Sequence, residues 1–466
     1  MNRYDRQLRL WGKEGQLLLT KSNVCIVGSE SVLLQETIKN LVLVGITRFH
    51  WFDELSPQTR DTSSFFYDDL IEDMAPLSPN EVSIVKHSIS DWNTIMQYET
   101  ISLMIIICDG QDLEMVLKQD LEQIQFPVIM GYSSGLYGYL RIKLSEPHFI
   151  IESRPDYVIP SFYLDNPWSE LSHYMDSIKF EMLDEYSFAQ LPYIVLLYKV
   201  LQHLDASHDK ITDKMIKDTL RDWYIKDLNP KGKYDLNYDE AMRYSYLAIS
   251  NTDYRTKLNQ LIQNCQDNSL KGHIWTDPYN DHVATLLQAI QIYLQNNDDI
   301  NVLVDGNIPD MESSSKYFGT LQNVYQERAD ASFVKFQETV QQVCNLDHKV
   351  RPDNNLITSF YHNVKNIRCI KPSSCTTSEF LTVQPQRDYS PILKTLISLQ
   401  TSSQSTMPHP HVNNKALMLT ENYPTASLMA GLVADETIKL ITHQYVPIDN
   451  TLTYDGIHNE MVTGTF

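Results

Sequence analysis

The 466-residue chain is poor in cysteine, and none of its six cysteines forms a Cys-x-x-Cys pair. Structural zinc sites and thioredoxin-like redox sites need closely spaced thiols, so the sequence predicts no metal site and no redox motif. We expect reduced thiols throughout. The cysteines are Cys25, Cys108, Cys265, Cys344, Cys369 and Cys375.

Long apolar runs and basic residues are also scarce. No apolar stretch reaches the about 20 residues of a membrane-spanning helix, and the charged N-terminal residues do not form a secretory signal. We therefore expect a cytoplasmic or nuclear protein with no membrane partner. The 38 Lys and Arg against 59 Asp and Glu give a net charge of -21. This charge argues against a nucleic-acid partner, which requires a clustered basic face, and it suits solubility or a basic protein partner.

The first 150 residues alternate short apolar runs with helix-length segments. Such alternation predicts a mostly parallel sheet covered by helices, which is a Rossmann-like α/β fold. The length of the chain allows two to four domains. The expected strands include 24–27, 46–52, 82–85, 103–108 and 128–130, and the expected helices 33–44 and 111–123.

Further along the chain the pattern changes three times. Alternation over 137–144 and 148–152 predicts an antiparallel hairpin that ends the parallel part of the sheet. Helical periodicity then dominates, with expected helices that include 191–204 and 315–344, and a buried helix is expected at 424–443 before extended segments. We expect four parts: a Rossmann-like half over 1–163, a helical insertion over 164–400, a polar linker over 401–414, and a returning helix and strands over 415–466.

The turn after the first strand reads Gly28-Ser29-Glu30-Ser31-Val32-Leu33. Loops that cradle a nucleotide phosphate use several glycines, so that backbone N–H groups reach the phosphate and helix and strand pack closely. Only Gly28 remains, and Glu30 adds negative charge near a helix N-terminus, where a phosphate would otherwise be favoured. The degenerate turn Gly28, Ser29, Glu30 and Ser31 is therefore predicted to hold no nucleotide.

The run from Tyr4 to Gly12 contains two arginines, Arg6 and Arg9. On a helix that begins near Tyr4, Leu8, Leu10 and Trp11 are expected to pack inward while the arginines project from neighbouring faces. The residues alone leave two interpretations. Both arginines are solvated over the Trp11 ring, or one is presented to a phosphate on another chain, a role that suits the forked, permanently charged guanidinium.

The same run, Tyr-Asp-Arg-Gln-Leu-Arg-Leu-Trp-Gly, resembles the opening of the ubiquitin-like modifier activating enzymes. In that family two Rossmann-type halves of the ThiF/MoeB type pair, one active and one inactive. The arginine before the glutamine reaches across to the ATP of the active half. The resemblance implies that Arg6 acts in trans on ATP that the partner subunit holds.

Other stretches extend the resemblance over nearly the whole chain. Residues 41–46 resemble the family's helix-to-strand stretch, and 431–442 followed by 447–450 resemble its C-terminal helix and strand. Residues 306–311, continuing to Tyr317 and 321–325, resemble the regulatory subunits for Nedd/Rub-type modifiers. That resemblance implies a heterodimer with a catalytic subunit, with the Nedd/Rub-type modifier as a second partner and its conjugating enzyme as a further candidate. It also implies that the helical insertion corresponds to a catalytic-cysteine domain without the cysteine, and that ATP and magnesium are bound by the partner subunit.

Departures from an active half concern the nucleotide site. Asp53 is kept, in a position that also suits a strand-end cap, but the family's repeat of acids is not, and 61–66 lacks the arginine of the phosphate-contacting Asn-x-x-Arg. The sequence therefore predicts a non-catalytic subunit that binds no cofactor itself. Cys375 has only Lys371 as a nearby cation and is not expected to form a thioester. His409 and His411 have no neighbouring ligands and are not expected to bind metal.

Three alternative functions remain. The small subunit of a SUMO-type activating enzyme shares the opening motif, but the long helical insertion and residues 308–311 count against it. A nicotinamide-dependent dehydrogenase is disfavoured because positions 30 and 33 are not glycine. A helical scaffold without a role in nucleotide chemistry is the third.

Overall fold

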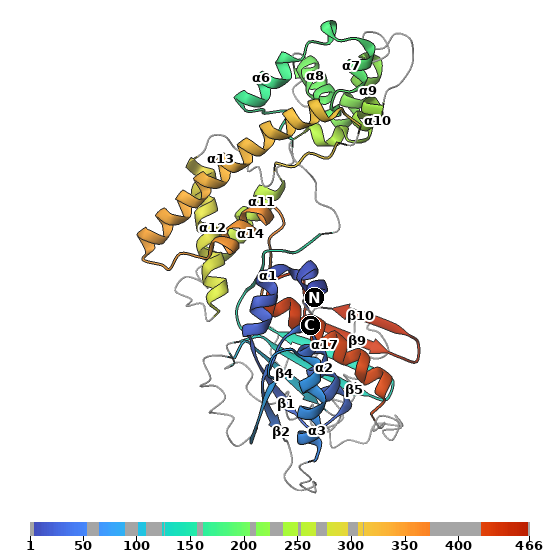
Figure 1. The fold of residues 1–466 in the computed structure, drawn as a ribbon, viewed down its shortest axis with the longest axis vertical. Helices are drawn as coiled ribbons and strands as arrows, with labels where there is room; N and C mark the ends of the chain where they lie inside the picture. Colours follow the sequence, from blue (N-terminus) through green and yellow to red (C-terminus); the bar gives the residue numbers. More distant parts are fainter. Residues whose placement is uncertain are drawn as a thin grey trace, which may run out of the picture. The chain divides into compact units, whose positions relative to one another are not determined.

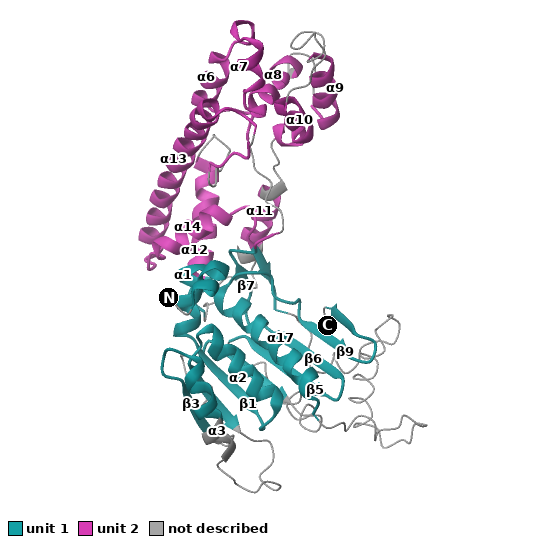
Figure 2. Ribbon diagram, turned by 45° about the vertical axis from the view of Figure 1, so that its right-hand side comes forward, with its two compact units in different colours: residues 1–153, 274–280, 368–466 teal, residues 154–273, 281–367 magenta. Residues whose placement is uncertain are grey.

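The chain folds into two compact units, which Figure 2 colours separately. Unit 1 comprises residues 1–153, 274–280 and 368–466, and unit 2 comprises 154–273 and 281–367. Residues 274–280, which the sequence assigns to the insertion, thus lie in unit 1. The computed structural model describes residues 4–53, 65–88, 101–108, 124, 126–155, 162–205, 211–223, 236–249, 253–266, 277–296, 306–310, 312–372 and 421–464. The expected linker at 401–414 lies outside them.

Unit 1 is built on an eight-stranded sheet with the order β10-β9-β6-β5-β4-β1-β2-β3 (Figure 1). The first five strands in the chain are parallel and the last three are antiparallel additions at one edge. The predicted Rossmann-like α/β class is therefore confirmed. The strands are β1 Asn23–Gly28, β2 Arg48–Asp53, β3 Ser83–Ser88, β4 Leu103–Cys108, β5 Val128–Ser134, β6 Tyr137–Lys143, β9 Thr451–Asp455 and β10 Glu460–Gly464.

Helices α2 (Val32–Val44) and α17 (Tyr423–Thr442) lie side by side on this sheet, as Figures 1 and 2 show. Their apolar side chains share one buried core with strands β1, β4 and β5. Gly138 of β6 permits close packing, because a Cβ there would collide with the Met429 side chain of α17. The expected return of the C-terminal segment to the first sheet is thus confirmed. The other helices of this part are α1 Asp5–Lys21, α3 Phe65–Met74 and η1 Ala75–Leu77.

The predicted hairpin between 137–144 and 148–152 is wrong. Strand β6 instead pairs with β5 across the two-residue turn Gly135-Leu136, where Gly135 has a φ of 56°. Strand β7 (His148–Ile150) pairs with the distant β8 (Arg368–Ile370) in a separate two-stranded sheet. Alternating polarity identifies a strand but not its partner, which here is about 220 residues away in the chain. The parallel part of the sheet nevertheless ends after β5, as expected.

The regular secondary structure in the described residues of unit 2 is all helical. Its 33-residue helix α13 begins where the sequence predicts, since the Ser314 hydroxyl accepts a hydrogen bond from the Tyr317 amide. Within the described part of the chain, no helix has the length and apolarity to span a membrane. The helices are α6 Ser169–Ser177, η4 Phe180–Met182, α7 Glu185–Ala189, α8 Tyr193–Asp205, α9 Asp213–Trp223, α10 Leu236–Arg243, η6 Ser245–Ala248, α11 Asp253–Gln266, α12 Pro278–Asn296, α13 Ser315–Asp347 and α14 Asn354–Asn363.

Candidate functional site

The two arginines of helix α1 differ in their surroundings. Arg9 donates through Nη2 to Oδ2 of Asp5 at 3.0 Å, one helical turn earlier. Arg6 lies exposed on the first turn, and among the described residues it has no hydrogen-bond or ion-pair partner. Neither guanidinium stacks on the Trp11 ring in the described contacts. Arg6 thus differs from Arg9 in having no partner among the described residues.

Trp11 is buried and Leu8 is half-buried, but Leu10 is 51% exposed, so the prediction that Leu10 packs inward is wrong. Leu8 and Trp11 are three residues apart and share one helix face, whereas Leu10 lies two residues from Leu8, on the opposite side. Gly12, with a φ of 70°, then interrupts the helix.

The first helix is fixed to unit 1 by two glutamines. Gln16 accepts from the Trp11 indole N–H at 3.1 Å and donates to the carbonyl oxygen of Val44, at the end of α2, at 2.8 Å. Gln444, just after α17, donates to the carbonyl oxygen of Trp11 at 2.9 Å. The segment that carries Arg6 is thus held against the ends of α2 and α17.

The packing of neighbouring strands explains why position 28 of the turn is a glycine. Gly28 has a φ of 154°, and a Cβ there would collide with the backbone oxygen of Ile107 on β4. Its carbonyl oxygen accepts a hydrogen bond from the Trp51 indole N–H at 2.9 Å. Gly28 is therefore required by the approach of two neighbouring strands, whether or not a nucleotide binds.

The amides at the start of α2 are bound within the chain itself. Ser31 caps the helix by accepting from the Leu34 amide at 3.1 Å. The carboxylate of Glu421 accepts from the Val32 amide through Oε2 and from the Leu33 amide through Oε1, each at 2.9 Å. These three amides are donors that an α-helix leaves without intrahelical partners. They are the groups that would contact a phosphate at this end of the sheet.

The acidic residue at this helix start is thus Glu421, which the sequence analysis missed. Glu30 is half-buried and makes no hydrogen bond or ion pair with the residues that the structure describes. The available signal was the place of Glu421, directly before the strong helix that returns to the first sheet. Because 389 residues separate Glu421 from Val32, only the tertiary fold brings them together.

Several other predicted residues cannot be placed. Asp53 ends β2, but its side chain lies outside the described residues, as do 54–64, Cys375, His409 and His411. No group of three or more potential metal ligands occurs within the described ranges. Cys25 is buried in β1, and burial raises the pKa of its thiol far above the usual range, which leaves it unreactive.

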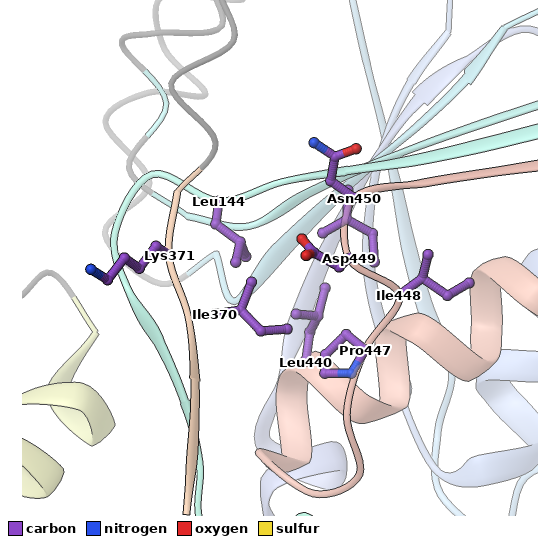
Figure 3. A pocket seen from close by; sticks show the side chains of 9 residues that line it. Leu144, Ile370, Lys371, Leu440, Pro447, Ile448, Asp449 and Asn450 are labelled. Carbon is purple, nitrogen blue, oxygen red and sulfur yellow. The ribbon is translucent and has the colours of Figure 1, made fainter. Parts of the chain in front are cut away.

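A small pocket lies at the other end of the sheet (Figure 3). Ile142 lines it and pairs with Ile129 near the start of β5, whereas Gly28 ends the parallel strand β1. Its walls are mostly aliphatic, with Asp449 and Lys371 as the charged residues. The pocket is therefore separate from the start of α2 and brings no acid–base or nucleophilic group to the predicted site.

Comparison with known proteins gives relatives over nearly the full length of the chain. The chain is 33% identical over 99% of both sequences to the NEDD8-activating enzyme E1 regulatory subunit of Saccharomyces cerevisiae. It is 24% identical to the subunit of that name from Danio rerio, covering 99% of this chain and 98% of the other. It is 22% identical to NEDD8-activating enzyme E1 regulatory subunit AXR1 of Arabidopsis thaliana, covering 98% of this chain and 95% of the other.

Two other comparisons add little. No family model matches the chain. A crystal structure of E. coli MccB with AMPCPP and MccA aligns with 31% of this chain and 48% of its own, at 15% identity and a TM-score of 0.25.

Proposed function

We propose, from the premise that this chain belongs to the family of NEDD8-activating enzyme E1 regulatory subunits, that it is the non-catalytic half of a heterodimer. Its partners in this proposal are the catalytic subunit and NEDD8, with the conjugating enzyme as a further partner. The complex works in the cytoplasm or nucleus, and this chain has no membrane or nucleic-acid partner.

The reaction of the complex has two steps. The C-terminal carboxylate of NEDD8 attacks the α-phosphate of ATP, which forms an acyl adenylate and releases pyrophosphate. A cysteine thiolate of the catalytic subunit then takes the acyl group as a thioester and releases AMP. In our proposal ATP, magnesium and the cysteine belong to the catalytic subunit.

The observation that carries the proposal is the difference between Arg6 and Arg9. Both arginines are exposed, but Arg9 pairs with Asp5 at 3.0 Å, whereas Arg6 has no partner among the described residues. Both lie on a helix segment that is anchored through Trp11. Negative charge on the phosphate oxygens grows as pyrophosphate leaves, and a pre-positioned guanidinium stabilises it. We assign this role to Arg6, acting in trans on ATP held by the catalytic subunit.

The turn at Gly28 supports the non-catalytic part of the proposal. The amides of Val32, Leu33 and Leu34 already have acceptors from this chain. An ATP phosphate would have to displace those acceptors before it could bind there.

The proposal is tested by ATP–pyrophosphate exchange and thioester formation with purified components. We expect no exchange by this chain alone, exchange when the catalytic subunit and NEDD8 are added, and charging of NEDD8 rather than SUMO or ubiquitin. Exchange by the lone chain would contradict the non-catalytic role. Charging of SUMO would favour the alternative small subunit, and no effect of this chain on any charging would favour a scaffold.

A further inference from the structure

The start of α2 has a bound anion that the chain provides itself. The two oxygens of the Glu421 carboxylate each accept from one of two successive amides, Val32 and Leu33, at 2.9 Å. The next amide, Leu34, is bonded to Ser31 Oγ, and that of Gln35 to the carbonyl oxygen of Ser31 at 3.0 Å. The first helical turn therefore has no amide left for an external acceptor.

The two-oxygen arrangement is the one that a phosphate adopts at such a position. A phosphate and a carboxylate both offer neighbouring oxygens with negative charge, and the helix dipole favours either. Charge-assisted hydrogen bonds to backbone amides are stronger than neutral ones. Glu421 thus fulfils, within one chain, the electrostatic requirement that a nucleotide would otherwise fulfil.

A second contact fixes the place of Glu421. Tyr423, two residues later, donates its hydroxyl to Oε1 of Glu36 on α2 at 2.9 Å. Glu36 in turn pairs with Lys39 at 3.0 Å. Because α17 begins at Tyr423 and packs along α2, these contacts join the starts of the two helices. The carboxylate is held there by the packing of two core helices.

We infer that Glu421 is a resident substitute for a nucleotide phosphate, which closes the anion position at the start of α2. This inference deepens the proposed function and rests on its claim that the chain holds no nucleotide. The loss of glycines from the turn weakens phosphate binding at the start of α2. The Glu421 carboxylate in addition occupies the amides that a phosphate would need. Glu421 is itself solvent-exposed, so its removal would open the position to anions from solution.

The test is hydrogen exchange at the Val32 and Leu33 amides in the full chain, with and without millimolar pyrophosphate. In the wild type we expect pyrophosphate to have no effect. In Glu421→Ala we expect exchange about fivefold faster, because a helix-capping acceptor contributes about 1 kcal/mol, and we expect pyrophosphate to slow it again. Glu421→Gln, which keeps one acceptor, should show a smaller change in the same direction and serves if the alanine variant fails to fold.

Glu460→Gln is the matched control, because Glu460 is exposed on β10 and its loss changes the net charge equally. The control should behave as the wild type does. Unchanged exchange in both Glu421 variants would overturn the inference. The inference would also be overturned if exchange became faster in the Glu421 variants but pyrophosphate did not slow it. Glu421 would then only cap the helix and would not occupy an anion position. Neither result depends on the charging assay, so the proposed function can fail independently.

Discussion

The imidazole of His443 lies between two oxygen acceptors, with Nε2 3.4 Å from the Asp277 carboxylate and Nδ1 2.9 Å from the carbonyl oxygen of Phe149. On its two faces it stacks against His148, with centroids 4.5 Å apart, and Tyr279, at 3.7 Å. This buried cluster joins the end of α17 to residues 277–280, all within unit 1.

The cluster predicts that unit 1 loses stability in acid. Burial lowers the pKa of His148 well below its usual range, and the neighbouring His443 lowers it further. Below about pH 6.5, His148 therefore binds a proton in the unfolded chain but stays neutral in the folded chain. The free energy of unfolding should fall by up to about 1.4 kcal/mol per pH unit for this one group. Urea titrations between pH 7.5 and 5 measure it.

Protonation of Asp277 should also lower the stability of unit 1, at a lower pH than the effect of His148. Burial raises the pKa of its carboxyl, but the hydrogen bond and charge of His443 outweigh burial and leave the pKa below its usual value. The stabilisation is present above the ordinary aspartate pKa and is lost as pH falls through the lowered one. Acid should therefore destabilise unit 1 in two successive ranges.

His148→Phe separates the histidine from other acid effects. Phenylalanine keeps a ring against His443 and takes up no proton. The slope of the free energy of unfolding against pH, between pH 6.5 and 5, should therefore decrease by the contribution of about one proton. His173→Phe, at an exposed position of α6, is the matched control for the exchange of a histidine for a phenylalanine. Equal slopes in the wild type and His148→Phe would refute the prediction.

Gly28→Ala should destabilise unit 1 by about 2–4 kcal/mol, because the added Cβ collides with the backbone of β4, which cannot move aside. Gly12→Ala provides the comparison. Gly12 also has a positive φ, but nothing lies within 4 Å of its added Cβ. Only a conformational cost of about 1–3 kcal/mol is expected there, because a φ of 70° with a ψ of -177° is a backbone conformation that is essentially confined to glycine. Equal losses in urea titrations of the two variants would show that the strand contact is not tight.

In unit 2, Tyr325→Phe should cost about 1–3 kcal/mol. The Tyr325 hydroxyl donates to the carbonyl oxygen of Phe162 at 2.8 Å in a fully buried environment, so its loss leaves that acceptor without a partner. Tyr174→Phe removes a longer, half-buried bond of 3.3 Å to the carbonyl oxygen of Tyr317 and should cost less. Urea unfolding of the two variants, followed by helical circular dichroism, decides the order.

The sequence predicts those parts of the fold that local patterns specify. The apolar run at 103–108 becomes buried strand β4, and Ser314 caps α13 as expected, because both signals lie within a few residues. The partner of β7 was missed, since pairing with β8 depends on the tertiary fold. Leu10 was misplaced because its burial depends on which face of α1 meets the rest of unit 1.

The candidate site divides in the same way. Arg6 was found because its motif is contiguous, and its assignment stays a prediction. The loss of glycines after Gly28 was visible in the turn itself. Glu421 was not, because a carboxylate far away in the chain reaches α2 only when α17 packs beside it. Local sequence suggested Glu30, the nearer acid, in its place.

The central claim is that this chain supplies an arginine to a nucleotide held by its partner. The most direct measurement is the rate of ATP–pyrophosphate exchange by the heterodimer assembled with Arg6→Ala, compared with Arg9→Ala, with equal heterodimer content verified on the same samples. We predict a loss of about 10²–10³-fold for Arg6→Ala and less than about twofold for Arg9→Ala, whose charge is already paired at the surface. Equal exchange rates in the two heterodimers would contradict the account.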